Sequence, residues 1–504
     1  MAAEKSPALG GLSRPEAAAR YALLAPAVHM CGQLLLILGT AMLVAAAVDF
    51  QVEPHIAEAF FLSAAITIAT GGVLYLSTRQ RRTQALDIRQ GFLLTTLSWL
   101  GIALFAALPF LLSNPHLSYA DAFFETMSGL TTTGATVLAG LDEMSRMINL
   151  WRALLQWLGG IGIVVMSMTI LPALRVGGMQ LLQTESSDRS DKILPHLTQV
   201  LRAVLALYCG FTVIFAIAYN MAGMSQFDAI VHAMTTIATG GYSTHDASFG
   251  YFADRPILEW LATLFMGLSA VTFGLFIIAL RGRPQALWRD PQVRGFAALL
   301  AVAIAIASYA AWHSGGHDPF TALRRAAFHV VSIVTTTGFT SEDYGHWGAL
   351  AVGLFFLLYF TGGCTGSTAG SIKVFRLIIM GRILSVIFKR MLSPHRVVRV
   401  AYGERPVSEE TQLSVASFVF LFLATVLVLA LVLASTGLDL LSALSSAATA
   451  VANVGPGLGH IVGPVGNFSS LSDTAKTAMA LGMLLGRLEL LTIFVLFTPS
   501  FWRH

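Results

Sequence analysis

Four stretches of the sequence align without gaps on a glycine, and in three of them threonine precedes that glycine. They are DAFFETMSGLTTTGATV from residue 121, DAIVHAMTTIATGGYST from 228, RAAFHVVSIVTTTGFTS from 325 and SALSSAATAVANVGPGL from 442, aligned on Gly134, Gly241, Gly338 and Gly455. Backbone carbonyls can replace the water shell of K⁺, but consecutive carbonyls face one pore only if φ alternates in sign. Glycine adopts positive φ at little cost, and a neighbouring threonine adds a hydroxyl oxygen. Four such loops around one axis predict a cation-binding pore.

Each aligned stretch is too short to cross a bilayer, and each lies between two long apolar segments. A spanning helix needs about 20 apolar residues. Candidate segments run over 28–50, 58–77, 91–113, 149–173, 196–222, 256–280, 294–312, 347–361, 413–436 and 472–498. Non-helical backbone at membrane depth persists only where it is buried in protein or lines a water-filled path. The expected unit is therefore a helix, a re-entrant half-helix with a glycine loop, and a second helix.

The expected fold is an all-α polytopic membrane protein, with two N-terminal helices followed by four pseudo-repeats of helix, pore loop and helix around a central pore. The helix pair occupies residues 1–90, and the repeats occupy 91–175, 195–282, 294–400 and 412–504. The C-terminal, negative dipole end of each half-helix would face the pore centre and favour a cation. Asp121 and Asp228 start two half-helices and are expected to be their N-terminal caps.

The composition agrees with a bilayer environment. Of the 504 residues, 55% are hydrophobic and only 12% are charged, with a mean hydropathy of +0.71; soluble domains carry about 25% charged residues. The net charge of +4 does not indicate nucleic acid as a partner, because the basic residues lie in loops. The first 20 residues show no signal peptide. Cys31, Cys209 and Cys364 lack metal-ligand spacing and are expected to be free thiols.

Basic residues recur after every second apolar segment, which predicts that these loops and both termini face the cytoplasm. The internal clusters lie at 79–89, 175–192, 281–294 and 373–399. Arg324 and Arg325 are an exception, since this topology places them outside. The stretch 373–402 is a candidate docking surface for a cytosolic partner, and simple anchoring by positive charge is the alternative.

Residues 361–371, with the sequence TGGCTGSTAGS, interrupt the second helix of the third repeat. Four glycines among serine and threonine disfavour a helix, so this break is expected to face a cavity. A nucleotide-binding loop is rejected, because it requires Gly-Lys followed by Ser or Thr, and Gly370 is followed by Ser371 and Ile372. A passive packing kink is the alternative to a gating loop.

Arg487 lies in the middle of the last apolar segment, where a charge costs at least about 2.5 kcal/mol and usually serves a function. Glu489 is close in sequence, but residues two apart lie on different helix faces. Arg487 is therefore expected to face the pore as an electrostatic barrier to K⁺. His232 and His329 lie in half-helices and are interpreted as packing or hydrogen-bonding residues, with a proton relay as the alternative.

These motifs resemble the Trk/Ktr/HKT superfamily of potassium transporters, and most closely its Trk-type membrane subunits. The resemblance covers nearly the whole chain, and its specific parts are TMSGLTTTGAT, TTIATGGYST, VTTTGFTSEDY, FTGGCTGSTAGSIK, ANVGPGLG and MLLGRLELLTI. In that family each loop contributes to a selectivity filter. The filter positions implied here are Thr132, Thr133, Gly134, Thr239, Gly240, Gly241, Thr336, Thr337, Gly338, Asn453, Val454 and Gly455. The fourth loop has no threonine, which implies less regular coordination than in a channel of four identical subunits.

The resemblance further implies potassium uptake across a bacterial inner membrane, by a protein that is not an enzyme. It implies K⁺ as the bound ion, no cofactor, a homodimer and a cytosolic nucleotide-binding regulatory subunit. The implied gating residues are Gly362, Gly363, Gly366, Ser367, Gly370 and Arg487. Symport with H⁺ or Na⁺ is the mechanistic alternative, since broken helices also occur in coupled transporters. The first-loop glycine disfavours a sodium transporter of the same fold, and the lack of a paired catalytic set disfavours an intramembrane enzyme.

Overall fold

The computed structural model describes residues 14–79, 87–113, 116–173, 193–395, 398–403 and 405–502. Its helices are α1 (Arg14–Ala46), α2 (Pro54–Ser77), α3 (Ile88–Ala106), α4 (Leu108–Leu112), α5 (Tyr119–Leu130), α6 (Arg146–Ala173), α8 (Ile193–Met221), α9 (Gln226–Ile237), α10 (Pro256–Ser269), α11 (Phe273–Leu280), α12 (Gln285–Arg289), α13 (Pro291–His313), α14 (Pro319–Val334), α15 (Ala349–Leu358), α16 (Val374–Leu392), α17 (Glu409–Ser435), α18 (Leu440–Ala452), α19 (Asp473–Arg487), α20 (Leu491–Phe494) and α21 (Pro499–Trp502). Short 3₁₀ helices are η3 (Ser248–Phe252), η4 (Tyr344–Trp347) and η5 (Val495–Phe497). Strands β1 (Ala401–Tyr402) and β2 (Arg405–Pro406) pair antiparallel.

The helices have the length and composition of a membrane bundle. Among the described residues, seven helices are long and apolar enough to cross a bilayer, and two bent pairs raise the number to nine. The expected all-α, multi-spanning architecture is therefore confirmed. Cys31, Cys209 and Cys364 are free thiols, as expected.

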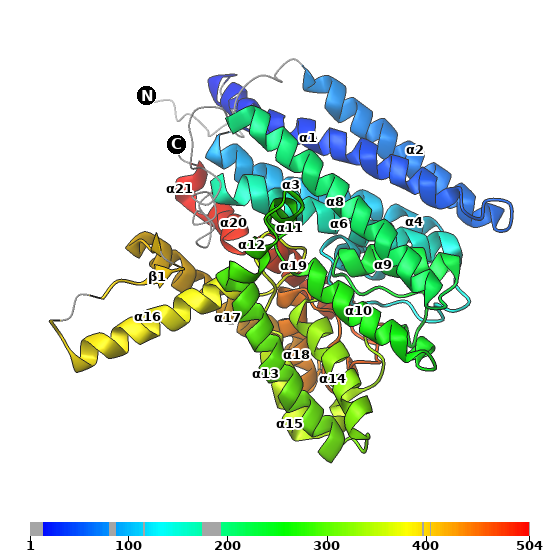
Figure 1. Cartoon of the computed structure of the whole chain (residues 1–504). Coiled ribbons are helices and arrows are strands. Elements are labelled where there is room, and N and C mark those ends of the chain that lie inside the picture. Colours follow the sequence, from blue (N-terminus) through cyan, green and yellow to red (C-terminus); the bar gives the residue numbers. More distant parts are fainter. Residues whose placement is uncertain are drawn as a thin grey trace.

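The N-terminal helices α1 and α2 form an antiparallel hairpin along one edge of the bundle, beside α3 (Figure 1). Small residues let their backbones approach closely, as is typical of helix pairs in membranes. A Cβ atom on Gly32 would lie 2.7 Å from the amide nitrogen of Tyr75, and one on Gly71 would lie 2.9 Å from the carbonyl oxygen of Gly32. The hairpin therefore depends on glycine at these two positions.

Four short helices, α5, α9, α14 and α18, carry the aligned stretches into the interior. In α14 and α18 nearly every residue of the last two turns is buried, which places the C-terminal ends inside the protein. The N-terminal caps are Ser118, Ser225, Asp318 and Asp439, whose side chains accept backbone N–H bonds of the first turn. The expectation that Asp121 and Asp228 are caps was wrong. Each lies in the first turn, and its backbone N–H donates to the capping serine.

Two segments expected to be single spanning helices are broken. Residues 256–280 form α10 and α11 at an angle of 92°, and residues 472–498 form α19 followed by α20 and η5 at 101°. In the first break, the carbonyl of Ala270 accepts a hydrogen bond from the Cys364 N–H (2.8 Å), and the N–H of Phe273 donates to Gly366 (3.1 Å). Backbone groups released by the bend thus find partners in 361–371, so the break leaves these two groups satisfied.

Candidate ion pathway

The four glycine loops, defined as residues 131–134, 238–241, 335–338 and 452–455, close into a ring. A Cβ atom on Gly134 would lie 2.1 Å from the carbonyl oxygen of Gly240 in the second loop. The same holds around the ring. A Cβ atom on Gly241 would lie 1.9 Å from the carbonyl oxygen of Thr337, one on Gly338 would lie 2.1 Å from that of Val454, and one on Gly455 would lie 2.7 Å from that of Thr133. Each glycine is therefore required by the backbone of the next loop, and the predicted filter positions of all four loops lie together.

The backbone in each loop alternates in sign, as the carbonyl argument requires. The glycines at 134, 241, 338 and 455 have φ of 85°, 79°, 83° and 108°, and the residues two positions earlier are also positive: Thr132 (53°), Thr239 (50°), Thr336 (57°) and Asn453 (57°). Positive φ was expected only at the glycines, so the four earlier positions are an addition to that prediction. A β-branched residue in this region is strained, so the surrounding structure must hold it there.

Polar side chains from neighbouring helices hold the loops. Gln156 of α6 donates to the carbonyl of Gly240 (2.6 Å) and accepts from the N–H of Tyr242 (3.1 Å). The side-chain amide of Asn453 donates to the hydroxyl of Thr133 (3.0 Å), which joins the fourth loop to the first. These bonds tie the ring together without using any of the four aligned glycines, Gly134, Gly241, Gly338 and Gly455.

A buried ion pair behind the first loop was not predicted. Arg152 of α6 lies 2.8 Å from a carboxylate oxygen of Glu125 in α5, and both side chains are at most 2% exposed. Arg152 also donates to the carbonyl of Ser243 (2.9 Å) and stacks over Tyr242, with 4.1 Å to the ring centroid. The pair therefore links the first repeat to the chain that leaves the second loop.

A second ion-pair cluster accounts for the basic pair that did not fit the charge pattern. Arg324 and Arg325 both contact Glu259, at 3.0 and 2.5 Å, and Arg325 also lies 3.5 Å from Glu342. The two arginines are compensated by carboxylates within the fold, so they carry little topological information.

A hollow of about 70 Å³, which we call the mouth, lies over the residues that follow the four glycines. His245 lines it and contacts Asp142 at 2.5 Å and Asp228 at 3.5 Å. Burial lowers the pKa of His245, but its bonds to the two carboxylates outweigh this effect and raise the pKa above 6.5. Partial burial of Asp142 is likewise outweighed by the hydrogen bond from His245, and the pKa of Asp142 is lowered. An acidic cluster with one titratable imidazole therefore borders the mouth.

The segment 361–371 lies against the other side of the ring, where the half-helices end. Gly370 donates its N–H to the hydroxyl of Thr336 (2.7 Å), and Thr368 donates its hydroxyl to the carbonyl of Ile237, the last residue of α9 (3.0 Å). A Cβ atom on Gly370 would also lie 2.6 Å from the carbonyl of Ala452. Two predicted gating residues are equally crowded. A Cβ atom on Gly362 would lie less than 3 Å from the carbonyl oxygen of Gly370, and one on Gly363 would lie less than 3 Å from that of Ala270. The segment therefore contacts the ends of α9, α14 and α18 at the base of three glycine loops.

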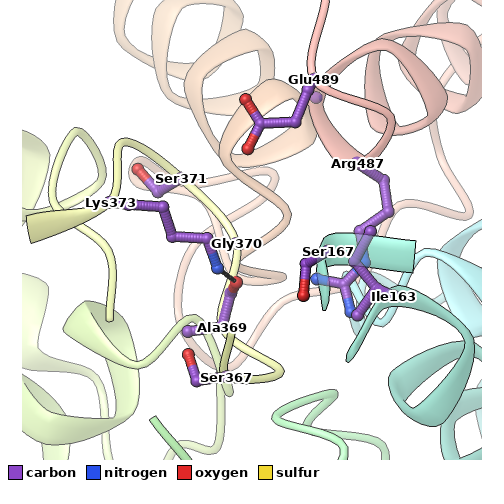
Figure 2. A pocket seen from close by; sticks show the side chains of 10 residues that line it. Ile163, Ser167, Ser367, Ala369, Gly370, Ser371, Lys373, Arg487 and Glu489 are labelled. Atoms are coloured by element: carbon purple, nitrogen blue, oxygen red, sulfur yellow. Dashed lines mark hydrogen bonds between the residues drawn. The ribbon is translucent and has the colours of Figure 1, made fainter. Parts of the chain in front are cut away.

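A small cavity of about 20 Å³ beside this segment collects buried charges (Figure 2). Lys373, the residue before α16, enters the cavity and donates to the carbonyl of Ala369 in the segment, while Arg487 enters from the end of α19 (Figure 2). Arg487 is 3% exposed and donates to the carbonyl of Thr368 (3.0 Å). Its Nε and Nη2 atoms have no hydrogen-bond partner within the described part of the chain. Predicted gating residues Ser367 and Gly370 also line this cavity.

The expectation that Arg487 and Glu489 lie on one helix was wrong, because α19 ends at Arg487 and Glu489 lies in the break before α20. Among the described residues, Glu489 makes no ion pair with Arg487. It lies 2.5 Å from Arg376 of α16, and that guanidinium stacks over Phe418 at 3.6 Å from the ring centroid. Arg376 is fully buried and Lys373 is 7% exposed. These two residues were expected to belong to a basic docking surface, and that expectation was wrong, because both point into the protein.

Comparison with known proteins identifies relatives over most of the chain. A family model described as TrkH, cation transport protein, matches residues 56–504. The chain is 48% identical over 453 residues to the Trk system potassium uptake protein TrkI of Halomonas elongata, covering 90% of this chain and 91% of that protein. It is 37% identical over 481 residues to the Trk system potassium uptake protein TrkH of Escherichia coli, covering 94% and 99%.

A crystal structure shows the same architecture. The potassium transporter TrkH from Vibrio parahaemolyticus superposes with a TM-score of 0.88 at 34% sequence identity, covering 95% of this chain and 100% of that one. The family match extends over residues 56–504, and the structural match covers 95% of the chain. The chain belongs to the TrkH family of cation transport proteins.

Proposed function

We propose that the chain takes up K⁺ through the ring of glycine loops, which acts as a carbonyl selectivity filter. The observation that carries this proposal is the closed ring with φ of alternating sign in all four loops. The hydroxyl oxygen of Thr132 and the amide oxygen of Asn453 are buried without a partner within the described residues. Buried oxygens without donors favour a cation as their missing partner. Relatives that are named potassium uptake proteins support K⁺ as that cation.

The mouth would face the outside of a bacterial inner membrane, and the Arg487 cavity the cytoplasmic side. In this orientation the segment 361–371 closes the path beneath the filter, with Gly362, Gly363, Gly366, Ser367 and Gly370 supplying the close backbone contacts and Arg487 the charge barrier. Its contacts with the ends of three half-helices support a gate more than a passive kink, because a kink in a helix would not require hydrogen bonds to the glycine loops.

A homodimer and a cytosolic nucleotide-binding subunit belong to the same proposal. The residual basic surface for that subunit lies at the far end of α16, which projects from the bundle (Figure 1). Lys389 and Arg390 in the last turn of α16 are exposed, and so is Arg382 in the middle of the helix. Replacing these three with serine should weaken binding of the regulatory subunit in a salt-sensitive way, and unchanged binding would place the docking site elsewhere.

Flux measurements on the purified protein in liposomes test the proposed function. K⁺ and Na⁺ uptake are compared with and without an imposed proton gradient. K⁺-selective flux that follows the K⁺ gradient alone supports a channel-like pore. Flux that requires the proton gradient, or a Na⁺ gradient, supports the symport alternative. Equal K⁺ and Na⁺ flux contradicts a selective filter.

A further inference from the structure

Glu125 in α5 holds the chain that leaves the first glycine loop. It precedes Gly134 by nine residues, and its carboxylate accepts from the hydroxyl of Thr136 (3.0 Å) and from the N–H of Val137 (3.0 Å). These two donors follow the glycine by two and three residues. The half-helix therefore binds the chain just after the loop. We call the extended residues that directly follow each aligned glycine the outgoing strand of that loop.

His232 and His329 occupy the same position, nine residues before Gly241 and Gly338. Each Nδ1 faces a backbone carbonyl of its own helix, Asp228 or Arg325, at 2.8 Å. A carbonyl only accepts, so Nδ1 carries the proton and Nε2 is an acceptor in the neutral ring.

The Nε2 atoms meet donors on the outgoing strands. His329 Nε2 accepts from the N–H of Ser341 (3.2 Å), three residues after its glycine. His232 Nε2 lies 3.0 Å from the hydroxyl of Ser243, two residues after its glycine. Both rings are fully buried, so each bond is made away from water. The carboxylate of the first repeat and the imidazoles of the next two therefore make the same contact, with a donor two or three residues after the glycine.

In the fourth repeat the same contact is made by Ser445, which lies ten residues before its glycine and not nine. Ser445 accepts from the N–H of Leu458 (2.9 Å), three residues after Gly455, and donates to the carbonyl of Leu458 (3.0 Å). Ser446 stands at the position equivalent to Glu125 and is fully buried, and its hydroxyl has no partner among the described residues. The chain therefore contains a natural control at that position.

We infer that Glu125, His232, His329 and Ser445 are positioning residues that fix the outgoing strand of each loop and thereby set the spacing of the carbonyl ring. The inference rests on the proposed function. Each loop is attached to its half-helix at one end, and without a second attachment its glycine carbonyl would be free to shift. A hydrogen-bond acceptor is the shared requirement, which explains why carboxylate, imidazole and hydroxyl serve in different repeats. The neutral, Nδ1-protonated rings also argue against the proton-relay alternative, because protonation of Nε2 in His329 would oppose the N–H of Ser341.

Selectivity tests this inference in variants that keep or remove the acceptor. His329→Ala and Ser445→Ala each remove the acceptor of one N–H on the outgoing strand, a bond worth about 1 kcal/mol, so the K⁺/Na⁺ flux ratio should fall by roughly fivefold. His329→Gln places an amide oxygen near the Nε2 position and should restore most of the ratio. Ser446→Ala, which removes a hydroxyl without a partner, should leave the ratio unchanged.

The readouts separate this inference from the proposed function. Each variant is checked by gel filtration in detergent, and K⁺ flux and the K⁺/Rb⁺ ratio are measured with the K⁺/Na⁺ ratio. If the parent shows no K⁺ flux, the proposed function fails. If the parent is selective and folded His329→Ala and Ser445→Ala keep its ratios, the positioning role is refuted. A loss in Ser446→Ala as large as that in Ser445→Ala would also refute it, since cavity formation alone would then account for the effect.

Discussion

Replacing Arg487 by alanine or glutamine should raise K⁺ flux through the purified protein, whereas Arg487→Lys should keep flux close to the parent value. The guanidinium lies 3.0 Å from the carbonyl oxygen of Thr368. An ion that reaches this carbonyl comes within about 6 Å of the charge, and at an effective dielectric constant near 20 two unit charges at that separation repel by about 3 kcal/mol. Removing the charge therefore lowers the barrier by at most about 3 kcal/mol, which corresponds to a flux at most about 100-fold higher.

Lys373 and Arg376 remain nearby after the substitution, so a gain between about 10- and 100-fold is expected. Concentrative ⁸⁶Rb⁺ uptake into liposomes, normalised to folded protein, measures it. Glutamine keeps a side-chain N–H near Thr368 but loses the charge, and lysine keeps the charge but loses the planar fork. Flux equal to that of the parent in all three variants would show that Arg487 does not face the ion path. High flux in all three would assign its effect to the hydrogen bond with Thr368.

Three further predictions concern the ring, the segment beneath it and the mouth. Gly134→Ser should reduce the K⁺/Na⁺ flux ratio, since any Cβ atom would lie 2.1 Å from the carbonyl of Gly240; an unchanged ratio in folded protein would remove this glycine from the filter. Deleting residues 363–368 should raise basal K⁺ flux and reduce dependence on the regulatory subunit, and a folded deletion variant with parental flux would show that the segment does not close the path. The raised pKa of His245 means that its pairing with Asp228 and Asp142 stabilises the fold below the unfolded pKa, about 6.5, and that this contribution is lost as pH rises through the folded pKa. The difference in thermal midpoint between the parent and His245→Gln should therefore shrink between about pH 6 and pH 9, and a difference that grows with pH would contradict the pairing.

The glycines of the ring could be predicted because each meets a requirement that only glycine satisfies. Positive φ and a carbonyl within 3 Å of the would-be Cβ leave no room for a side chain, so the residue type reports the geometry. The positive φ of Thr132 and Asn453 left no such signal. Their conformation is imposed by the ring around them, and threonine in a loop is unremarkable in a sequence.

The breaks in the spanning segments show the same limit. The break at 361–371 was visible from its four glycines, whereas residues 270–272 and 488–490 contain neither glycine nor proline. Those breaks arise from partners distant in sequence, such as the Cys364 N–H that binds the carbonyl of Ala270. The pair of Glu125 and Arg152 was missed for a related reason. The two residues lie on different helices, and only the packing of α5 on α6 brings them together.

The hydrogen bonds of the segment 361–371 constrain how it moves. Moving it from its seat breaks the bonds from Cys364 to Ala270, from Phe273 to Gly366 and from Thr368 to Ile237. Each buried group left without a partner costs about 1–3 kcal/mol, so displacement requires water to enter or work to be supplied from outside the membrane.

α16 is connected directly to the segment and could transmit a force to it. α16 begins at Val374, immediately after Lys373, whose ammonium is bonded to Ala369 within the segment. The exposed, basic end of the same helix projects from the bundle (Figure 1). In the gate proposed above, a partner that displaces α16 would act first on Lys373 and, through Ala369, on the neighbouring carbonyl of Thr368, to which Arg487 donates. Because Lys373 begins α16 and Arg487 ends α19, such a displacement would separate the segment 361–371 from Arg487 as well as from the ring.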